Sequence, residues 1–183
     1  MFYYIMKILA FIPLWIFCPT IIKGKRNIPK GKCIFVINHR SNFDALIILN
    51  MIWRRQYVLC KKEAFKHFPT RCILKGMGAI PVDRQKVELS TLKQCFFVLG
   101  KEKVLTIFPE GTRNKTNEPL LKLKDGAGII AQKTNSPIVP IWIKKKQKPF
   151  CFNTIYVGEP FYITKEDKNS NEIISQKMLE LKK

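Results

Sequence analysis

Two side chains near the start of the chain could carry out acid–base chemistry together. His39 and Asp44 lie five positions apart in the run Asn-His-Arg-Ser-Asn-Phe-Asp. A neutral imidazole is suited to removing a hydroxyl proton near neutral pH, and a carboxylate is its usual orienting partner. The chain has one other histidine, His67. His39 is therefore the main candidate for a histidine base, with Asp44 as the group that orients it.

A structural interpretation of the same run also fits. Ser41, followed three residues later by Asp44, resembles a helix capping box in which Ser41 is the N-cap of the next helix. Ser41 lacks the Gly-x-Ser-x-Gly surroundings of a nucleophile elbow. We therefore expect no acyl-enzyme on Ser41. The spacing of His39 and Asp44 alone leaves the catalytic and structural interpretations open.

The run at 76–84, Gly-Met-Gly-Ala-Ile-Pro-Val-Asp-Arg, ends in a candidate phosphate-binding residue. Two glycines before a strand-like stretch indicate a tight turn or a close approach of the backbone. Arg84 has the planar fork that binds phosphate through two hydrogen bonds. A simple turn with an exposed Arg84 explains the same residues.

The run at 108–114, Phe-Pro-Glu-Gly-Thr-Arg-Asn, follows an apolar strand-like stretch. Active-site residues of α/β sheets tend to lie at such strand ends. Gly111 permits a backbone turn closed to other residues, and Arg113 could bind phosphate at two points. Glu110 could orient a guanidinium or a substrate hydroxyl. The alternative is an ordinary turn with a local pair between Glu110 and Arg113.

Short β-rich stretches alternate with helical patterns along most of the chain. The predicted strands are Cys33–Ile37, Tyr57–Cys60, Ala79–Val82, Val104–Phe108, Ile138–Ile143 and Thr154–Val157. The predicted helices are Phe43–Arg54, Val87–Leu99, Gly126–Lys133 and Ser170–Leu181. This alternation predicts the α/β class: a single layered domain with a mixed, largely parallel sheet flanked by helices.

Composition restricts the partners. The 183 residues include 33 basic and 13 acidic side chains, a net charge of +20. Such a surface should attract nucleic acid, acidic lipid headgroups, an acidic carrier protein or a phosphorylated substrate. The six cysteines are dispersed without a Cys-x-x-Cys pair, so we expect no zinc or other metal site, no disulfide framework, and a reducing compartment.

The N-terminus is strongly apolar. Residues 1–22 contain a single charge, Lys7, among aromatic and aliphatic side chains, with Pro13 and Pro19 inside the stretch. We expect residues 1–24 to form a membrane-anchoring helical segment that lies in or dips into the membrane surface, ahead of a catalytic domain at 25–183. A signal peptide and a buried amphipathic helix are the alternatives; against the first, no small-residue cleavage site follows.

The motifs together, in this order, resemble the four sequence blocks of the glycerolipid acyltransferase family. The blocks are His-x₄-Asp, then Gly-x-Gly-x-Ile-x-x-Asp-Arg, then Phe-Pro-Glu-Gly-Thr-Arg, then Val-Pro-Ile within the Ile138–Ile143 strand. The resemblance covers roughly residues 25–158 and is closest to the 1-acylglycerol-3-phosphate O-acyltransferase (lysophosphatidic acid acyltransferase) branch.

This resemblance implies a reaction and a site. His39 would be the general base and Asp44 its orienting partner, with the acyl group passing directly from an acyl thioester to the free hydroxyl of a lysophosphatidate. The acceptor site would comprise Arg84, Glu110, Gly111, Thr112 and Arg113. No cofactor is implied; the donor would be acyl-CoA or acyl-ACP.

The resemblance also implies a membrane-associated protein on the cytoplasmic face. Its partners would be membrane lipids (the acceptor and an anionic bilayer surface) and the acyl carrier protein or coenzyme A thioester. Three alternatives stay open: an acceptor that is another lysophospholipid, glycerol 3-phosphate, or an amine-bearing lipid. A basic nucleic-acid-binding protein would explain neither the apolar N-terminus nor the run around Glu110, and a nucleic-acid recognition motif is missing from the sequence.

Overall fold

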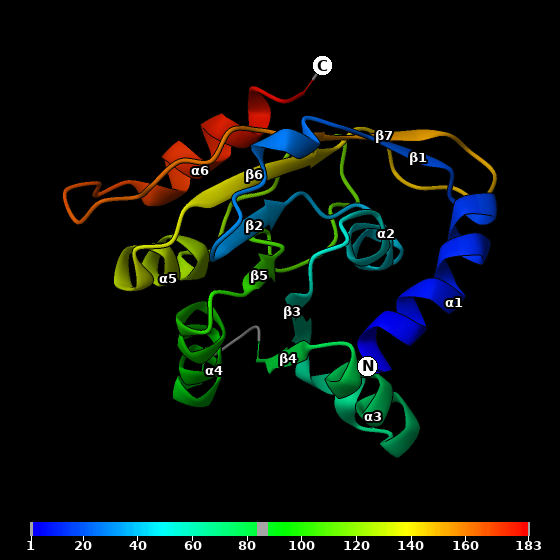
Figure 1. Ribbon diagram of the computed structural model, residues 1–183. Coiled ribbons are helices and arrows are strands. Elements are labelled where there is room, and N and C mark those ends of the chain that lie inside the picture. The colour runs from blue at the N-terminus through cyan, green and yellow to red at the C-terminus, as the bar shows by residue number, and fades with distance from the viewer. Residues whose placement is uncertain (1, 84–87, 183) are drawn as a thin grey trace.

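The computed structural model describes residues 2–83 and 88–182 and alternates helices with strands (Figure 1). The helices are α1 (Phe2–Phe17), α2 (Asp44–Met51), α3 (Phe68–Gly76), α4 (Leu89–Gly100), α5 (Gly126–Thr134) and α6 (Ser170–Leu179). The strands are β1 (Thr20–Lys23), β2 (Cys33–Ile37), β3 (Gln56–Lys61), β4 (Ala79–Val82), β5 (Val104–Ile107), β6 (Ile138–Ile143) and β7 (Asn153–Val157). Two short 3-10 turns span Lys25–Asn27 and Lys62–Phe65.

These strands form one sheet in the order β1-β7-β6-β2-β5-β3-β4. Every neighbouring pair is parallel except β6 and β7, which run antiparallel. The predicted α/β class, with a mixed and largely parallel sheet flanked by helices, is therefore confirmed.

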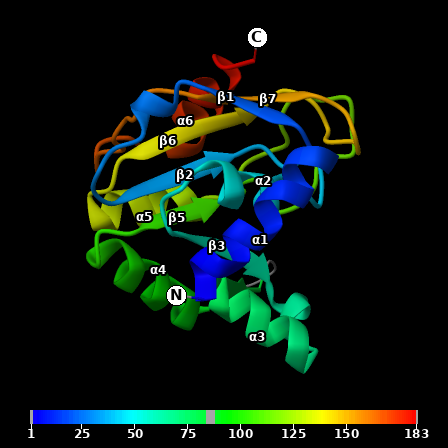
Figure 2. The same ribbon diagram turned by 45° about the vertical axis from the view of Figure 1, so that its right-hand side comes forward.

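Strand β2 shows why the central strands are uniformly apolar. Its residues alternate between two clusters: Ile34 and Val36 pack with α4, α5 and α6, whereas Cys33, Phe35 and Ile37 pack with α2. Figures 1 and 2 show α4, α5 and α6 on one side of the sheet and α1 and α2 on the other. Because both faces are covered, all five residues are buried.

Parallel strands bring their carboxyl ends to the same edge of the sheet, and here five adjacent strands, β6-β2-β5-β3-β4, do so. The order β2-β5-β3-β4 is parallel throughout. The residues that follow these strands, around His39, Phe108, Lys61 and Asp83, therefore lie at one edge, the usual location of a site in an α/β sheet.

The first part of the chain differs from the expected membrane-anchoring helical segment at residues 1–24. Helix α1 ends at Phe17, and residues 20–23 form β1, which lies beside β7 in parallel register. Pro19, between them, has no N–H to continue a helix. None of the helices within residues 2–83 and 88–182 is both long and apolar enough to cross a membrane.

Helix α3 was not predicted. It has no buried residue, and its apolar side chains Phe68 and Ile73 are exposed, whereas α4 buries Cys95, Val98 and Leu99. The other helices begin and end within a few residues of their predicted positions. Val87, the predicted start of the helix now called α4, lies outside the described residues.

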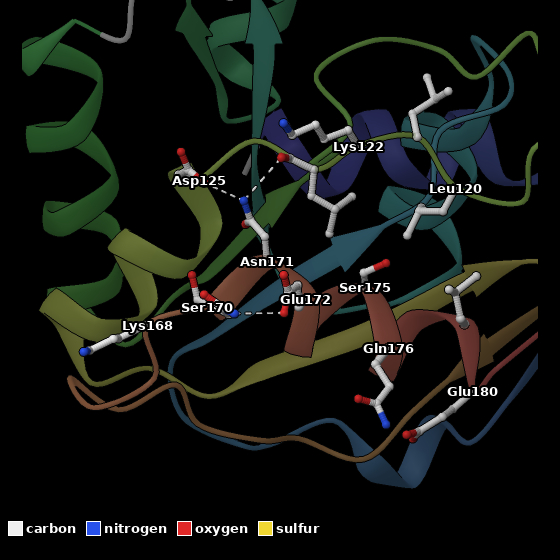
Figure 3. Close-up of a pocket in the computed structure, with 14 residues that line it drawn as sticks. Leu120, Lys122, Asp125, Lys168, Ser170, Asn171, Glu172, Ser175, Gln176 and Glu180 are labelled. Atoms are coloured by element: carbon white, nitrogen blue, oxygen red, sulfur yellow. Dashed lines mark hydrogen bonds between the residues drawn. The ribbon is translucent and has the colours of Figure 1, made fainter.

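A hollow of about 780 Å³ lies between α6 and residues 120–125 (Figure 3). Asn171 of α6 donates hydrogen bonds to the carbonyl of Leu123 and to Asp125 across it. None of the residues that the sequence selected for chemistry lines this hollow.

Candidate active site

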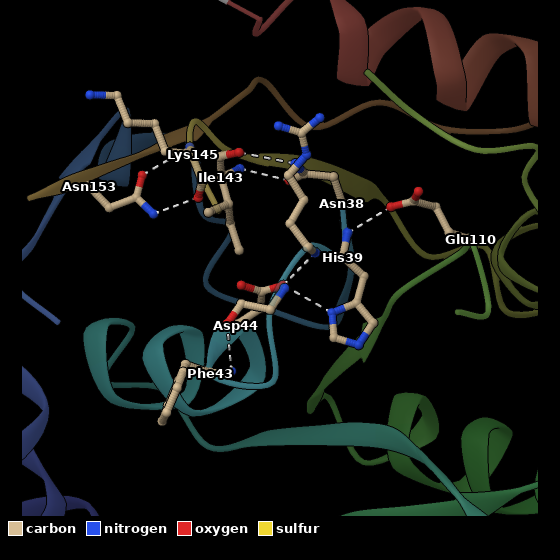
Figure 4. A network of polar contacts seen from close by, with 10 residues as sticks. Asn38, His39, Phe43, Asp44, Glu110, Ile143, Lys145 and Asn153 are labelled. Carbon is tan, nitrogen blue, oxygen red and sulfur yellow. Dashed lines mark hydrogen bonds and ion pairs between the residues drawn. The ribbon is translucent and has the colours of Figure 1, made fainter. Parts of the chain in front are cut away.

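Asp44 organises the segment that carries His39. It is the first residue of α2 and is fully buried. Its Oδ2 atom accepts hydrogen bonds from the backbone amides of Arg40 and Ser41, each at 2.7 Å, and lies 2.9 Å from His39 Nδ1 (Figure 4). One carboxylate oxygen therefore fixes both the turn before α2 and the orientation of the imidazole.

The cap of α2 differs in detail from the capping box. The N-cap is Phe43, and the Ser41 hydroxyl accepts a hydrogen bond from the Phe43 amide at 3.2 Å. The Asp44 carboxylate points back toward the preceding loop, where it contacts His39 and the amide of Arg40, and not toward the amides of the first turn of α2. The structural and catalytic interpretations of the segment are thus combined in one residue.

The ring of His39 presents one nitrogen to the open side. Since the carboxylate of Asp44 can only accept, Nδ1 carries the proton and Nε2 is left as an acceptor. Among the described residues Nε2 has no hydrogen-bond partner. The ring packs against Phe108, with 4.4 Å between centroids, and its side chain is 13% exposed. A substrate hydroxyl could therefore reach this nitrogen.

The backbone of His39 is held from the β5 side. Its N–H donates to Glu110 Oε1 at 2.7 Å, and its carbonyl accepts from the amide of Asn114, also at 2.7 Å. The second oxygen of Glu110 accepts from the amide of Leu121 at 3.0 Å. Burial raises the pKa of the Glu110 carboxyl, while its hydrogen bonds from His39 and Leu121 act in the opposite direction. Glu110 thus joins the loop after β2 to two parts of the loop between β5 and α5 through main-chain amides.

A cavity of about 350 Å³ opens beside His39. It is lined by residues from the ends of β2, β3, β4 and β5, including Lys61, Asp83 and the run Gly111-Thr112-Arg113. The first residues of α5, Gly126 and Ala127, also line it. The cavity therefore combines a histidine, basic side chains and the start of a helix, where backbone N–H groups favour an anion.

A side chain at position 111 would be disfavoured by both the backbone conformation and the space available. Its φ is +66°, in the left-handed region, and a Cβ there would lie 2.7 Å from Lys124 Cε. Lys124 also lines the cavity, and its amide donates to the carbonyl of Pro109 at 2.9 Å. The turn after β5 therefore packs directly against the segment that precedes α5.

The predicted site residues fall into three groups. His39, Gly111, Thr112 and Arg113 line the cavity together, and Asp44 lies directly behind His39. The Glu110 side chain is buried against main-chain amides and does not line the cavity. Arg84 lies outside the described residues.

Several residues at the site were not selected from the sequence. Asn38 exchanges two hydrogen bonds with the backbone of Ile143, at 2.7 and 3.0 Å, and so fixes the end of β2 against the end of β6. Asn114 and Lys124 are the others. Asparagine and lysine are common in loops, so the sequence alone gave no reason to choose these. Across residues 2–83 and 88–182, no group of three His, Cys, Asp or Glu side chains is arranged to hold a metal ion.

The family model and the related proteins that match this chain all carry the name acyltransferase. The sequence model of the Acyltransferase family matches residues 20–144. A chloroplastic 1-acyl-sn-glycerol-3-phosphate acyltransferase of Brassica napus is 33% identical over 144 residues, which are 76% of this chain and 41% of that protein. The 1-acyl-sn-glycerol-3-phosphate acyltransferase of Helicobacter pylori is 34% identical over 127 residues, 66% of this chain and 52% of that protein. This chain thus spans about half the length of these relatives.

One solved structure has a similar fold. The crystal structure of the 1-acyl-sn-glycerophosphate acyltransferase PlsC from Thermotoga maritima superimposes with a TM-score of 0.75. The match covers 96% of this chain and 75% of that one, at 22% sequence identity.

Proposed function

This chain belongs to the acyltransferase family, and on that premise we propose that it transfers a fatty acyl group to 1-acyl-glycerol-3-phosphate. The donor is an acyl thioester of coenzyme A or acyl carrier protein, and the product is phosphatidic acid. The relatives' names support the choice of acceptor. The observation that carries the proposal is the buried Asp44 bonded to His39 Nδ1, with His39 Nε2 left open to a cavity that Arg113 lines.

In the proposed reaction His39 acts as a general base. Nε2 accepts the proton of the substrate hydroxyl as the oxygen attacks the thioester carbonyl. The resulting tetrahedral intermediate collapses, the carbon–sulfur bond breaks, and the thiolate takes the proton from Nε2. Asp44 keeps the proton on Nδ1 and stabilises the imidazolium that forms transiently, as the carboxylate of a Ser-His-Asp triad does. Protons balance, and His39 returns to its starting form.

Glu110 has a positioning role in this proposal. Its carboxylate accepts the amide of His39 and never reaches the cavity. It therefore holds the base relative to the turn after β5, where Gly111, Thr112 and Arg113 face the substrate. The family resemblance implied that Glu110 belongs to the acceptor site. Its contact with the His39 amide favours instead an effect on the reaction through the position of His39.

The acceptor phosphate would be bound by Arg113 and the start of α5. Arg113 can form a charge-assisted, two-point contact with phosphate. Gly126 and Ala127 bring the amino end of α5 to the same cavity, and helix amino ends favour negative charge. Lysophosphatidate and glycerol 3-phosphate share a terminal phosphate, whereas lysophosphatidylcholine carries its phosphate as a diester.

Helix α1 would keep the protein at the bilayer. Most of its large apolar side chains are exposed, among them Ile8, Leu9, Ile12 and Trp15. Exposed apolar patches of this size mark interaction surfaces, and an aromatic-bearing helix of this kind suits the membrane interface. The net charge of +20 would add attraction to acidic lipids on the cytoplasmic face.

The test is acyl transfer by the purified full chain, with radiolabelled acyl-CoA or acyl-ACP in mixed micelles. His39→Ala should lower the rate by about 10²–10⁴-fold because a positioned base contributes that much. His67→Ala is the matched control: His67 is exposed and does not line the cavity, so that variant should keep the wild-type rate.

Three acceptors separate the alternatives. Lysophosphatidate should be used in preference to lysophosphatidylcholine and glycerol 3-phosphate. Retention of more than about a tenth of the wild-type rate by His39→Ala would reject the histidine mechanism. A clear preference for either other acceptor would reject the assigned substrate while leaving the family assignment intact.

A further inference from the structure

The loop between β6 and β7, residues 144–152, has an unusual composition. Its sequence Lys-Lys-Lys-Gln-Lys-Pro-Phe-Cys-Phe contains four lysines, two phenylalanines and no acidic residue. Phe150 and Phe152 are each 67% exposed. Two large aromatic side chains exposed this close together belong to an apolar patch, and such patches mark interaction surfaces.

The loop is internally fixed by buried amides. Gln147 is buried and donates to the carbonyls of Lys148 and Cys151, both at 3.0 Å, and it accepts from Asn153 Nδ2 at 2.9 Å. Asn153 also pairs with the backbone of Lys145. The polar groups therefore face inward and are satisfied, while the phenyl rings face outward. This is the reverse of the arrangement that solvent alone favours.

Phe150 is held in place by the end of α1. Its amide donates to the carbonyl of Phe17 at 2.7 Å, and the two rings lie 5.0 Å apart. Its φ of +59° is rarely adopted by a bulky side chain, so the surroundings maintain a strained residue with its ring exposed. Figures 1 and 2 both show the loop beside the carboxyl end of α1. The ring of Phe150 thus extends the exposed apolar surface of α1 from Phe17 onto the loop.

The lysines of the loop lack neutralising partners. The ion pairs found within residues 2–83 and 88–182 join His39 to Asp44, Lys62 to Glu88 and Lys177 to Glu180. None involves the loop. Exposed aromatic rings flanked by unpaired lysines match the chemistry of an anionic bilayer, in which rings enter the interfacial layer and lysines face acidic headgroups. An acidic protein would satisfy the lysines but not the rings beside α1.

The loop is also tied to the candidate active site. Ile143, the last residue before it, is fixed to Asn38 by two hydrogen bonds, and Asn38 precedes His39 (Figure 4). The position of the loop relative to His39 is therefore set by the fold. A membrane held at the loop would have a defined orientation relative to the cavity.

We propose that residues 144–152 form a second membrane-contact element, which inserts Phe150 and Phe152 into the interface of an anionic phospholipid bilayer and binds its headgroups through the neighbouring lysines. With α1 it makes a two-point contact that fixes the orientation of the cavity above the membrane. Only this last consequence rests on the proposed function; docking itself needs no turnover.

The test is partition of the full chain onto vesicles of phosphatidylcholine, with and without phosphatidylglycerol, measured by flotation. Phe150→Ser combined with Phe152→Ser should lower the partition onto both vesicle types by about tenfold or more, because two apolar side chains leave the interface. Lys144→Gln combined with Lys146→Gln should lower only the partition onto anionic vesicles, by roughly fivefold per lysine.

Phe97→Ser is the matched control. Phe97 is also 67% exposed and has a lysine, Lys101, 5.7 Å from its ring, but it lies on α4, on the other side of the sheet. That variant should bind both vesicle types as the wild type does. Melting curves of the lysine variant and of Phe97→Ser should superimpose on that of the wild type, since the replaced side chains are exposed.

Two outcomes would overturn the proposal. One is partition of both loop variants within about twofold of wild type, which is below the effect of losing a single lysine contact. The other is unchanged vesicle binding with lost binding to acyl carrier protein, which would assign the loop to a protein partner. Acyl transfer in detergent micelles, assayed in parallel, separates this from the proposed function: loop variants should keep that activity, and a wild type that binds vesicles but transfers no acyl group would reject only the function.

Discussion

At the scale of single residues, the two oxygens of Asp44 have unequal surroundings. Oδ2 meets His39 Nδ1 and two backbone amides, whereas Oδ1 is buried without a hydrogen-bond partner among the described residues. A buried carboxylate oxygen left unpaired is costly. The free-energy cost of the unpaired Oδ1 is offset because Oδ2 fixes both the turn and the imidazole.

Asp44→Asn should separate these two tasks. The amide oxygen can still accept from one of the three donors, but the negative charge that would stabilise an imidazolium is lost. We expect kcat to fall by about 100-fold or more, with little change in KM because Asp44 does not line the cavity. Steady-state kinetics would show this; Asp167→Asn, at a half-buried loop position outside the cavity lining, is the control. A kcat near wild type would leave Asp44 with only its structural task.

Arg113 provides a prediction with the opposite kinetic signature. It is exposed at the cavity and can contact phosphate. Arg113→Ala should raise the KM for lysophosphatidate by about 10- to 100-fold, the equivalent of one charged hydrogen bond or a bidentate pair. Arg26→Ala, at an exposed site outside the cavity, should leave KM unchanged. An unaltered KM in the Arg113 variant would assign phosphate binding to other groups.

At this scale the sequence predicted His39, Asp44 and the turn at 110–113 because their residue types are rare or chemically distinctive. It did not predict that Glu110 contacts main-chain amides, since a carboxylate looks the same whether it faces substrate or backbone. Asn38 and Asn114 were missed for a related reason: their effect comes from hydrogen bonds to distant backbone groups, which no local pattern encodes.

At the scale of elements, α1 is fastened to the domain by one buried cation. Lys7 is 0% exposed, and its Nζ donates to the carbonyl of Ile52, at the end of α2, at 2.8 Å. Burial lowers the pKa of Lys7 from an ordinary 10.5 to about 8. The bond caps the carboxyl end of the helix that begins with Asp44.

The unfolding free energy should therefore depend on pH through Lys7. The unfolded chain holds this proton up to about pH 10.5, whereas the folded chain releases it near pH 8. Between these values the unfolded state binds more protons, so stability should rise with pH. Lys7→Met should lose this rise, and Lys115→Met, at an exposed site, should keep it. Urea unfolding at pH 7, 8 and 10 would measure the difference; parallel curves for wild type and Lys7→Met would contradict it.

The edge strand β1 depends on a glycine at its end. Gly24 has a φ of +79°, and a Cβ there would overlap the backbone carbonyl of Val157 in β7. Gly24→Ala should destabilise the fold by about 1–3 kcal/mol, the range for a residue forced into a disfavoured backbone region. Gly100→Ala is the control, because a Cβ at Gly100 meets nothing within 4 Å. Denaturant midpoints would show whether only the first variant is weakened.

Most elements could be predicted because burial leaves a pattern in the sequence. The central strands are covered on both faces and read as continuous apolar runs. Strand β1 was missed because its apolar residues follow those of α1 without a change of composition. Helix α3 was also missed, and none of its residues is buried.

At the scale of the whole molecule, the apolar and basic features gather beside the sheet edge formed by β1 and β7. Helix α1, β1 and the loop at 144–152 all lie there, although the loop is far from α1 in the sequence. In the sequence the apolar N-terminus and the lysine-rich loop are separate runs. Their proximity comes from the parallel pairing of β1 with β7, a long-range contact that no local window reveals.

The hydrogen bond between the His39 amide and Glu110 joins residues 71 positions apart, and this separation has a consequence during synthesis. While the chain is still emerging from the ribosome, His39 is made well before Glu110, which holds its backbone in the folded protein. Contacts between distant positions also form late in folding. The proposed acyl transfer would therefore begin only after the second half of the chain has been made, and under that proposal a truncated translation product would be inert toward the cell's acyl pool.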